Sequence, residues 1–229
     1  MRTTAILSGL AALLATSSAA PLDARGPLNA ITCTGQTITG TLVVRNPDQS
    51  THVASFVKGD TDTHGRLKLT TKYQGVPAPT SQRWKFSVCN SAEYIYGGRK
   101  RDEEPESTEY TGFLSPYNHP NKALAVGDNY RHDASDGTEY DLVSDDKADS
   151  RFTYQSLTEF FSLYHNTSDT GDFYTLAYGG REGGLTAGFG YSPISVRSGN
   201  SIFVRMKSVE TGELALFANY YGYALELHP

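Results

Sequence analysis

After its first 20 residues the chain lacks any apolar run of about 20 residues, the length that a membrane-spanning helix requires. Residues 1–20 have a basic start at Arg2, an apolar stretch over residues 5–15 that is too short to span a bilayer, and small residues at 18–20, just before Pro21. This pattern is typical of a secretory signal peptide that is removed on export, the alternative being an amphipathic helix of the mature fold. We therefore expect a secreted protein, extracellular or associated with a cell wall, that has no membrane partner.

Cysteine is scarce, since Cys33 and Cys89 are the only two in the chain. In a secreted chain an even pair predicts one disulfide, and two free thiols or a shared metal are the alternatives. A bridge between them would remove about 4 kcal/mol of conformational entropy from the denatured chain on the loop-closure model. The length suits one large all-β domain, whose core is sizeable enough to fold without further bridges.

A basic patch is also missing. The formal net charge is −5, and the one basic run, residues 99–101, is followed directly by the acidic residues 102–104. Nucleic-acid binding needs a positive stripe that neutralises phosphates, so we expect no nucleic-acid partner. The dibasic pair Lys100 and Arg101 is a possible processing site, and the alternative is an exposed loop of mixed charge.

Catalytic motifs are equally scarce. The chain has no Gly-x-Ser-x-Gly nucleophile elbow, and both cysteines suit a bridge better than a nucleophile's role. Its six histidines are scattered, without the pair at positions i and i+4 that binds zinc on a helix. We therefore assign no catalytic residue, no metal site and no cofactor.

Acidic residues cluster in two places. Residues 60–65 place oxygen-bearing side chains as in the first half of a calcium-binding loop, but Thr71 stands where such a loop needs a bidentate carboxylate. We interpret Asp60 and Asp62 as turn residues between strands, and the acidic residues at 145–149 as a solvated loop. A carboxylate pair suited to glycoside hydrolysis stays open, because its separation is a spatial property.

The chain is rich in aromatic residues and glycine, with 15 tyrosines, 10 phenylalanines and 22 glycines. This composition is typical of β-proteins with many tight turns. Convincing helical periodicity is absent, whereas short alternating segments bounded by Gly, Pro, Asn and Asp predict strands. The predicted strands are residues 39–44, 52–57, 66–70, 83–88, 112–115, 123–126, 140–143, 151–154, 161–164, 173–177, 185–189, 202–206, 214–217 and 224–227.

These strands predict a single all-β domain over residues 31–229, preceded by a flexible lead-in or short propeptide at residues 21–30. The first four form one unit. A second unit is expected to start near Gly112 and a third near Phe160, with the charged insert at residues 97–109 lengthening the first interval. We expect the domain to be a monomer.

Three four-stranded units resemble a β-trefoil. The segment Gln82-Arg83-Trp84 matches the Gln-x-Trp signature of ricin-B-like trefoils, and the segments 110–114 and 122–126 resemble the paired strands of one repeat. The counterparts at 150–152 and 200–202 have lost both the Gln and the Trp. The chain also resembles small secreted proteins of fungi. The resemblance implies a closed barrel of three four-stranded repeats, and a two-sheet β-sandwich is the alternative. Trp84 itself is expected in the core.

Aromatic residues beside polar ones suggest where a ligand would bind. Sugar rings stack on aromatic faces while Asn, Asp and His fix their hydroxyls, so loops that combine the two suit glycan binding. The alternative is that many of these tyrosines pack in the core. The candidate glycan-binding residues are Tyr94, Tyr96, Tyr117, Asn118, Tyr220 and Tyr221.

The chain has one Asn-x-Ser/Thr sequon, at Asn166, which we place in a turn and expect to carry N-glycosylation. Three functions remain. The first is a secreted, non-catalytic protein that binds glycans of a cell wall or host surface. The alternative is a protease inhibitor or effector that contacts a secreted protein through residues 97–109. The third is a hydrolase whose carboxylates are not identified.

Overall fold

The computed structural model describes residues 31–90, 109–127, 137–147, 158–169, 171–178, 189–210 and 220–229. Strands dominate these residues, and the predicted all-β class is confirmed. The strands are β1 (Thr32–Arg45), β2 (Thr51–Val53), β3 (Ser55–Thr61), β4 (Leu67–Tyr73), β5 (Val76–Pro77), β6 (Trp84–Asn90), β7 (Glu109–Pro116), β8 (Lys122–Val126), β9 (Glu139–Asp146), β10 (Phe160–Ser168), β11 (Gly171–Ala177), β12 (Phe189–Ser198), β13 (Ser201–Glu210) and β14 (Ala224–His228).

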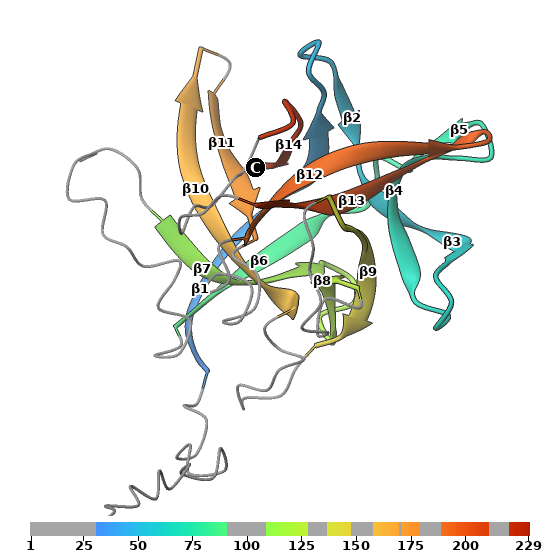
Figure 1. The fold of residues 1–229 in the computed structure, drawn as a ribbon. Coiled ribbons are helices and arrows are strands. Elements are labelled where there is room, and N and C mark those ends of the chain that lie inside the picture. The colour runs from blue at the N-terminus through green and yellow to red at the C-terminus, as the bar shows by residue number, and fades with distance from the viewer. Residues whose placement is uncertain are drawn as a thin grey trace, which may run out of the picture.

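Six strands form a closed antiparallel barrel in the order β1, β6, β7, β10, β11 and β14 (Figure 1). The barrel closes where β14 returns to β1, with Thr41 opposite His228 and Arg45 opposite Ala224. The short strand β2 also pairs with β1. Closure pairs both edges of each barrel strand, which separates this architecture from the open two-sheet sandwich considered above.

A second antiparallel sheet has the order β12, β13, β4, β9 and β8, and β3 and β5 also pair with β4. Its three central strands contact one another pairwise. Strand β13 pairs with β9 at Arg205 opposite Asp141, and β4 pairs with β9 at Lys68 opposite Val143. Strand β13 also pairs with β4. In Figure 1 the long β12–β13 hairpin and strands β3 to β5 extend to the right, whereas the β10–β11 hairpin projects at the upper left.

Each hairpin of the second sheet lies in the chain between two barrel strands. Strands β3 and β4 lie between β1 and β6, β8 and β9 between β7 and β10, and β12 and β13 between β11 and β14. Strand β10, which begins at Phe160, pairs with β7 on one side and with β11 on the other, so the start of a third unit near Phe160 stays a prediction. Alternation in the sequence identifies a strand but not its long-range partner.

The barrel and the second sheet share one apolar core. Trp84 is fully buried, its ring centroid lies 5.2 Å from that of Phe56, and its Nε1 donates to the carbonyl of Ala54 at 3.3 Å. Its predicted core position is confirmed. The hydrophobic cluster that contains Trp84 draws on both sheets. Its members include the barrel residues Leu42, Phe86, Leu114, Phe161 and Leu225 and the second-sheet residues Leu69, Leu124, Leu142, Val204 and Met206.

Two glycines permit close backbone contact between barrel strands. A Cβ at Gly112 on β7 would lie 1.9 Å from the carbonyl oxygen of Ser87 on β6. A Cβ at Gly40 on β1 would lie 2.3 Å from the carbonyl oxygen of His228, at the seam that closes the barrel. Any side chain at these positions would push the strands apart, so both glycines are structural requirements of the closed barrel.

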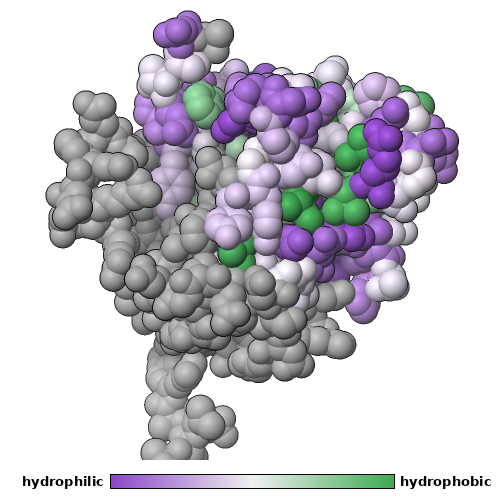
Figure 2. Space-filling view, turned by 45° about the horizontal axis from the view of Figure 1, so that its top comes forward, coloured by the Kyte–Doolittle hydropathy of each residue, from purple (hydrophilic) through white to green (hydrophobic). Residues whose placement is uncertain are grey.

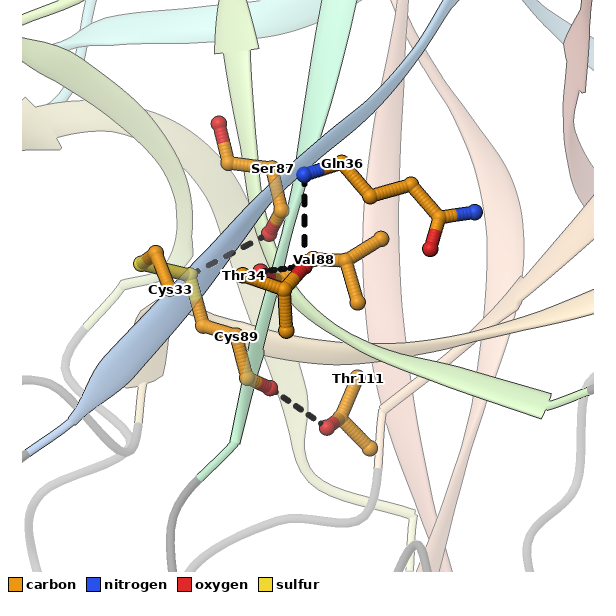
Figure 3. The surroundings of a disulfide bond; sticks show 7 residues. All are labelled: Cys33, Thr34, Gln36, Ser87, Val88, Cys89 and Thr111. Carbon is orange, nitrogen blue, oxygen red and sulfur yellow. Dashed lines mark hydrogen bonds between the residues drawn. A yellow bond between two sulfur atoms is a disulfide. The ribbon is translucent and has the colours of Figure 1, made fainter.

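The predicted disulfide is confirmed. Cys33 on β1 lies opposite Cys89 on β6, and an S–S bond of 2.06 Å joins them across a sequence separation of 56 (Figure 3). Two threonine hydroxyls reinforce this end of the barrel, since Thr34 donates to the Val88 carbonyl at 3.3 Å and Thr111 to the Cys89 carbonyl at 2.8 Å. The bridge thus joins neighbouring strands at the end of the barrel where β1 begins.

Most of the predicted strands within the described residues are confirmed, and the exceptions are instructive. Of the strand expected at 185–189 only Phe189 lies within the described residues, and it begins β12, which continues through Pro193. Strand β12 pairs only with β13 among the described strands, so Pro193 lies on an edge where its missing N–H costs no hydrogen bond. The strands predicted at 151–154 and 214–217 lie outside the described residues.

Two expectations for acidic residues need correction. Asp60 is not a turn residue but lies on β3, with only 5% of its surface exposed, whereas Asp62 does lie in a turn. Asp145 and Asp146 belong to the end of β9 rather than to a loop, because they pair with Ala123 and Lys122 of β8. In both cases strand pairing overrides the turn preference of aspartate.

Hydrophobic side chains reach the surface only sparsely. On the face drawn in Figure 2 the coloured surface is largely hydrophilic, with hydrophobic residues in small separate areas. Among the described residues, the exposed large hydrophobic side chains are Val76, Tyr117 and Tyr220. No helix within the described ranges has the length and apolar character needed to cross a membrane.

Candidate functional site

A pocket of about 450 Å³ lies between the β3–β4 hairpin and the turn that joins β7 to β8. Its volume falls in the range of sites for small ligands. Segments far apart in the sequence build it, and we call it the Gln82 pocket. Its lining residues are Phe56, Lys58, Leu67, Ser81, Gln82, Arg83, Pro116, Asn118, His119, Lys122 and Ser144.

Backbone hydrogen bonds fix the β7–β8 turn that forms one wall of the Gln82 pocket. The N–H of His119 donates to the Pro116 carbonyl at 3.0 Å, and the N–H of Lys122 donates to the His119 carbonyl at 3.0 Å. The N–H of Tyr117 donates to the carbonyl of Arg83 at 2.8 Å, which ties the turn to the opposite wall. The position of Asn118 is therefore set by backbone contacts on both sides of the pocket.

Gln82 connects this pocket to the core. Its Oε1 accepts a hydrogen bond of 2.9 Å from the backbone N–H of Phe56 on β3, and Trp84, two residues later, packs against the Phe56 ring. The amide therefore keeps its Nε2 group for a further partner, since the described residues offer Nε2 no hydrogen bond. The segment Gln82–Trp84 thus joins a fully buried side chain, that of Trp84, to a polar amide, that of Gln82, which lines the pocket.

The charge of the Gln82 pocket is positive. Lys58, Arg83 and Lys122 line it together with His119, and the described residues of its lining include no Asp or Glu. Lys122 pairs with Asp146, whose side chain is 78% exposed, so this is a weak surface pair. Lys58 and Arg83 make no ion pair with any described residue. The pocket therefore carries unneutralised positive charge beside neutral hydrogen-bonding groups.

A second pocket, of about 560 Å³, lies over the strands where the three hairpins meet, and we call it the Arg66 pocket. It contains both signs of charge. Its lining residues are Thr61, Asp62, Thr63, Arg66, Lys68, Gly127, Glu139, Tyr140, Asp141 and Arg205.

The charges of the Arg66 pocket are paired with one another. Arg66 contacts Asp62 at 2.7 Å and Asp145 at 3.2 Å. Arg205 contacts Asp141 at 2.6 Å and Glu139 at 3.1 Å, and Lys68 contacts Asp141 at 3.4 Å. Burial disfavours the Arg205 charge, but Asp141 and Glu139 outweigh it and raise the pKa of Arg205. Bases of β4 and β13 thus meet acids of β9, which holds the hairpins together.

Two carboxyl groups beside this pocket are shifted in opposite directions. Burial raises the pKa of Asp60 above its ordinary value, against a hydrogen bond of 2.9 Å donated by the Thr70 hydroxyl. Burial also opposes ionisation of Asp62, but N–H groups of Arg66 and His64 donate to it and lower its pKa overall. Asp60 is not part of either pocket's lining. The carboxylates that line the Arg66 pocket are engaged by cations, an arrangement that suits a structural role better than acid–base catalysis.

The structure separates the candidate glycan-binding residues. Asn118 lines the Gln82 pocket, and Tyr117, next to it, is 56% exposed but is not part of the lining. Tyr220 and Tyr221 lie elsewhere: their rings contact each other at 5.1 Å, and Lys207 of β13 lies over the Tyr221 ring. Tyr94, Tyr96, the dibasic pair Lys100 and Arg101, and residues 97–108 of the charged insert lie outside the described residues.

Asn166 lies on strand β10, opposite Phe173, rather than in the turn that follows. Its Nδ2, the atom that would carry a glycan, donates to the Tyr164 carbonyl at 2.9 Å and to the Thr175 hydroxyl at 3.0 Å. Glycosylation at Asn166 stays a prediction, and it would remove one of the two N–H donors that make these hydrogen bonds.

Sequence reasoning missed Lys58, Arg83 and His119 as possible ligand contacts. They come from three separate segments, and only folding brings them to one pocket. The Gln-x-Trp match could have pointed to this pocket, because it places the polar residue Gln82 two positions before Trp84, which is buried in the core. Within the described ranges, no group of three or more His, Cys, Asp or Glu side chains is placed to hold a metal ion.

Known protein families, characterised proteins and solved structures were each compared with this chain, and none of them matches it.

Proposed function

We propose that this chain is a secreted, β-trefoil-like protein that binds extracellular glycans without turning them over, and that the Gln82 pocket is its glycan site. The observation that carries the proposal is the lining of that pocket. Neutral hydrogen-bonding groups of Ser81, Gln82, Asn118 and Ser144 stand beside apolar surface from Phe56 and its neighbours. This is the combination that a sugar ring, with its hydroxyls and its apolar C–H face, requires.

The arrangement of strands supports the β-trefoil part of the proposal. A β-trefoil consists of a six-stranded barrel and three hairpins, and each hairpin connects two barrel strands. The β3–β4, β8–β9 and β12–β13 hairpins occupy these places here, and they contact one another through β4, β9 and β13. The Gln82–Trp84 segment lies at the start of β6, which is the fourth strand of the first group. An experimental structure whose three groups superpose by threefold rotation would test this part.

Secretion is supported by the signal-like residues 1–20 and agrees with the Cys33–Cys89 disulfide, since such bridges persist in oxidising environments. The architecture also fits a role in ligand binding. A barrel that is tied by a disulfide holds a small pocket whose walls include residues 81–83 and the β7–β8 turn beside strand residues, and loops on a rigid scaffold are where binding residues concentrate.

The test is binding of the purified protein to a glycan array and to insoluble wall polysaccharides, with chromogenic glycosides assayed in the same samples. We expect saturable binding that free sugar competes, without release of chromophore. Asn118→Ala should weaken binding about fivefold or more, because it removes hydrogen bonds to the ligand. Asn200→Ala is the matched control, since Asn200 is an exposed asparagine outside both pockets.

A second matched pair tests the contribution of aromatic stacking. Tyr117 and Tyr220 are each 56% exposed, but only Tyr117 adjoins a residue of the Gln82 pocket. Tyr117→Ala should weaken binding while Tyr220→Ala leaves it unchanged. Absence of binding to any glycan would contradict the proposal. Equal losses in the Asn118 and Asn200 variants would place the site elsewhere, and release of chromophore would favour a hydrolase.

A further inference from the structure

We infer that the Gln82 pocket selects sugars that carry a negative charge, a carboxylate or a sulfate ester, over neutral sugars. This inference rests on the proposed function, because it names the ligand class of the same site. Lys58 and Arg83 line the pocket from β3 and from the segment before β6, and Lys122 lines it from β8. Three cationic side chains from three segments thus surround one cavity.

Two of the three cations of this pocket are not used in ion pairs by the described part of the fold. Arg66, Lys68 and Arg205 in the Arg66 pocket each contact a carboxylate within 3.4 Å. In the Gln82 pocket, by contrast, Lys58 and Arg83 have no carboxylate partner among the described residues. A chain with a net charge of −5 has acids enough to neutralise them, so their unpaired state leaves them available to an anion from outside.

The chemistry of the three cations suits a charged sugar better than an isolated phosphate or sulfate. The guanidinium of Arg83 can bind a carboxylate or sulfate through two parallel hydrogen bonds, whereas the ammonium groups of Lys58 and Lys122 act as point charges. Asn118 and Gln82 stand beside these cations and can bind sugar hydroxyls. A ligand that combines hydroxyls and an anionic group therefore satisfies both halves of the lining.

The decisive experiment compares ligands that differ only in charge. Binding of the purified protein is measured to polygalacturonate and to the same polymer with its carboxyls methyl-esterified. Sulfated dextran and unmodified dextran form a second pair, which shows whether the anion can be a sulfate ester. We expect each charged polymer to bind at least tenfold more tightly than its neutral counterpart, with the difference shrinking as salt is raised from low to physiological concentration.

Charge-removing variants locate the effect in the pocket. Lys58→Gln and Arg83→Gln should each weaken binding to the charged polymers about fivefold. Lys72→Gln and Arg197→Gln are the matched controls, because these cations also lack an ion pair with a described residue but lie outside both pockets. Asp146→Asn should act in the opposite direction and strengthen binding about twofold, because it frees Lys122 from its partner.

The outcomes separate the inference from the proposed function. Equal affinity for esterified and free polygalacturonate, with loss of binding in Asn118→Ala, would overturn charge selection and keep glycan binding. Absence of binding to every charged and neutral polymer would overturn both. Charged-polymer binding that Lys58→Gln and Lys72→Gln reduce equally would show general surface attraction, which also overturns the inference.

Discussion

The Gln82 pocket and the Arg66 pocket lie on the same protein but use charge in opposite ways. In the Arg66 pocket the cations of two hairpins meet the carboxylates of a third, and Asp141 alone contacts both Lys68 and Arg205. In the Gln82 pocket the cations face a cavity to which the described part of the chain contributes no carboxylate. The first arrangement stabilises contacts between hairpins, and the second leaves charge for a ligand. Lysine and arginine therefore have different roles in the two pockets. In one they bind carboxylates of the chain itself, and in the other they are left for a ligand.

The largest expected effect comes from a residue on which the Gln82 pocket depends. Trp84→Ala removes a fully buried side chain and its hydrogen bond to the Ala54 carbonyl. We expect the free energy of unfolding to fall by about 3 to 5 kcal/mol, measured by denaturant titration. The Phe56 ring, which packs on Trp84 and lines the Gln82 pocket, would lose its support, so binding should fall as well. Unchanged binding would show that the pocket does not depend on this anchor.

The next effect tests the structural role of the Arg66 pocket. Asp141→Asn removes the charge that Arg205 and Lys68 share, at contacts of 2.6 and 3.4 Å, and these side chains are only partly exposed. We expect a loss of about 1 to 2 kcal/mol in the free energy of unfolding, with glycan affinity unchanged. Asp172→Asn is the control, because its ion pair with His165 involves a side chain that is 57% exposed and should contribute less. A drop in glycan affinity in the Asp141 variant would contradict the division of roles.

The two shifted carboxyls beside the Arg66 pocket make a prediction about pH. The lowered pKa of Asp62 means that its ionisation stabilises the fold above the unfolded value, about 3.9, and that this contribution is lost as pH falls through the folded pKa. The raised pKa of Asp60 has the opposite effect, since its contribution is present below about 3.9 and is lost as pH rises through the folded pKa.

Unfolding measured across pH 2 to about 7 separates these two contributions. Asp62→Asn should be less stable than the parent protein at neutral pH, and this difference should shrink as the solution is acidified. Asp60→Asn should gain stability relative to the parent as pH rises, because it removes a carboxylate that burial disfavours. Parallel pH profiles for the parent protein and both variants would contradict both assignments.

The residues that could be predicted from the sequence are those whose role depends on local pattern. Alternation located most of the described strands, the even cysteine count predicted the Cys33–Cys89 bridge, and Trp84 was placed in the core. The grouping into units that start near Gly112 and Phe160 stays a prediction, because alternation does not reveal long-range pairings such as that of β10 with β7. Local signals therefore predict the elements well but not their long-range partners.

The candidate site was less predictable because no single segment contains it. Asn118 was found through its neighbour Tyr117, on the expectation that aromatic residues mark sugar sites, yet the lining of the pocket includes Asn118 and not Tyr117. No ligand role is predicted for Lys58 or Arg83 from the sequence. Their shared cavity, whose described lining residues include no acid, depends on how the β3–β4 hairpin lies against the β7–β8 turn. Convergence of this kind is set by tertiary packing, which sequence spacing does not encode.

The smallest expected effect on stability belongs to the Gln82 pocket itself. Lys58→Gln and Arg83→Gln remove charges that have no carboxylate partner among the described residues, so the free energy of unfolding should stay within about 0.5 kcal/mol of the parent. A slight gain is the expected direction, because each change lowers repulsion among the cations around the cavity. Thermal and denaturant unfolding of both variants, beside Asp141→Asn, measures this directly. A clear loss of stability would mean that these cations serve the fold after all, and the contrast between the two pockets would disappear. Preserved stability with weakened binding is the behaviour of residues kept for a ligand, since binding residues commonly add nothing to the stability of the free protein.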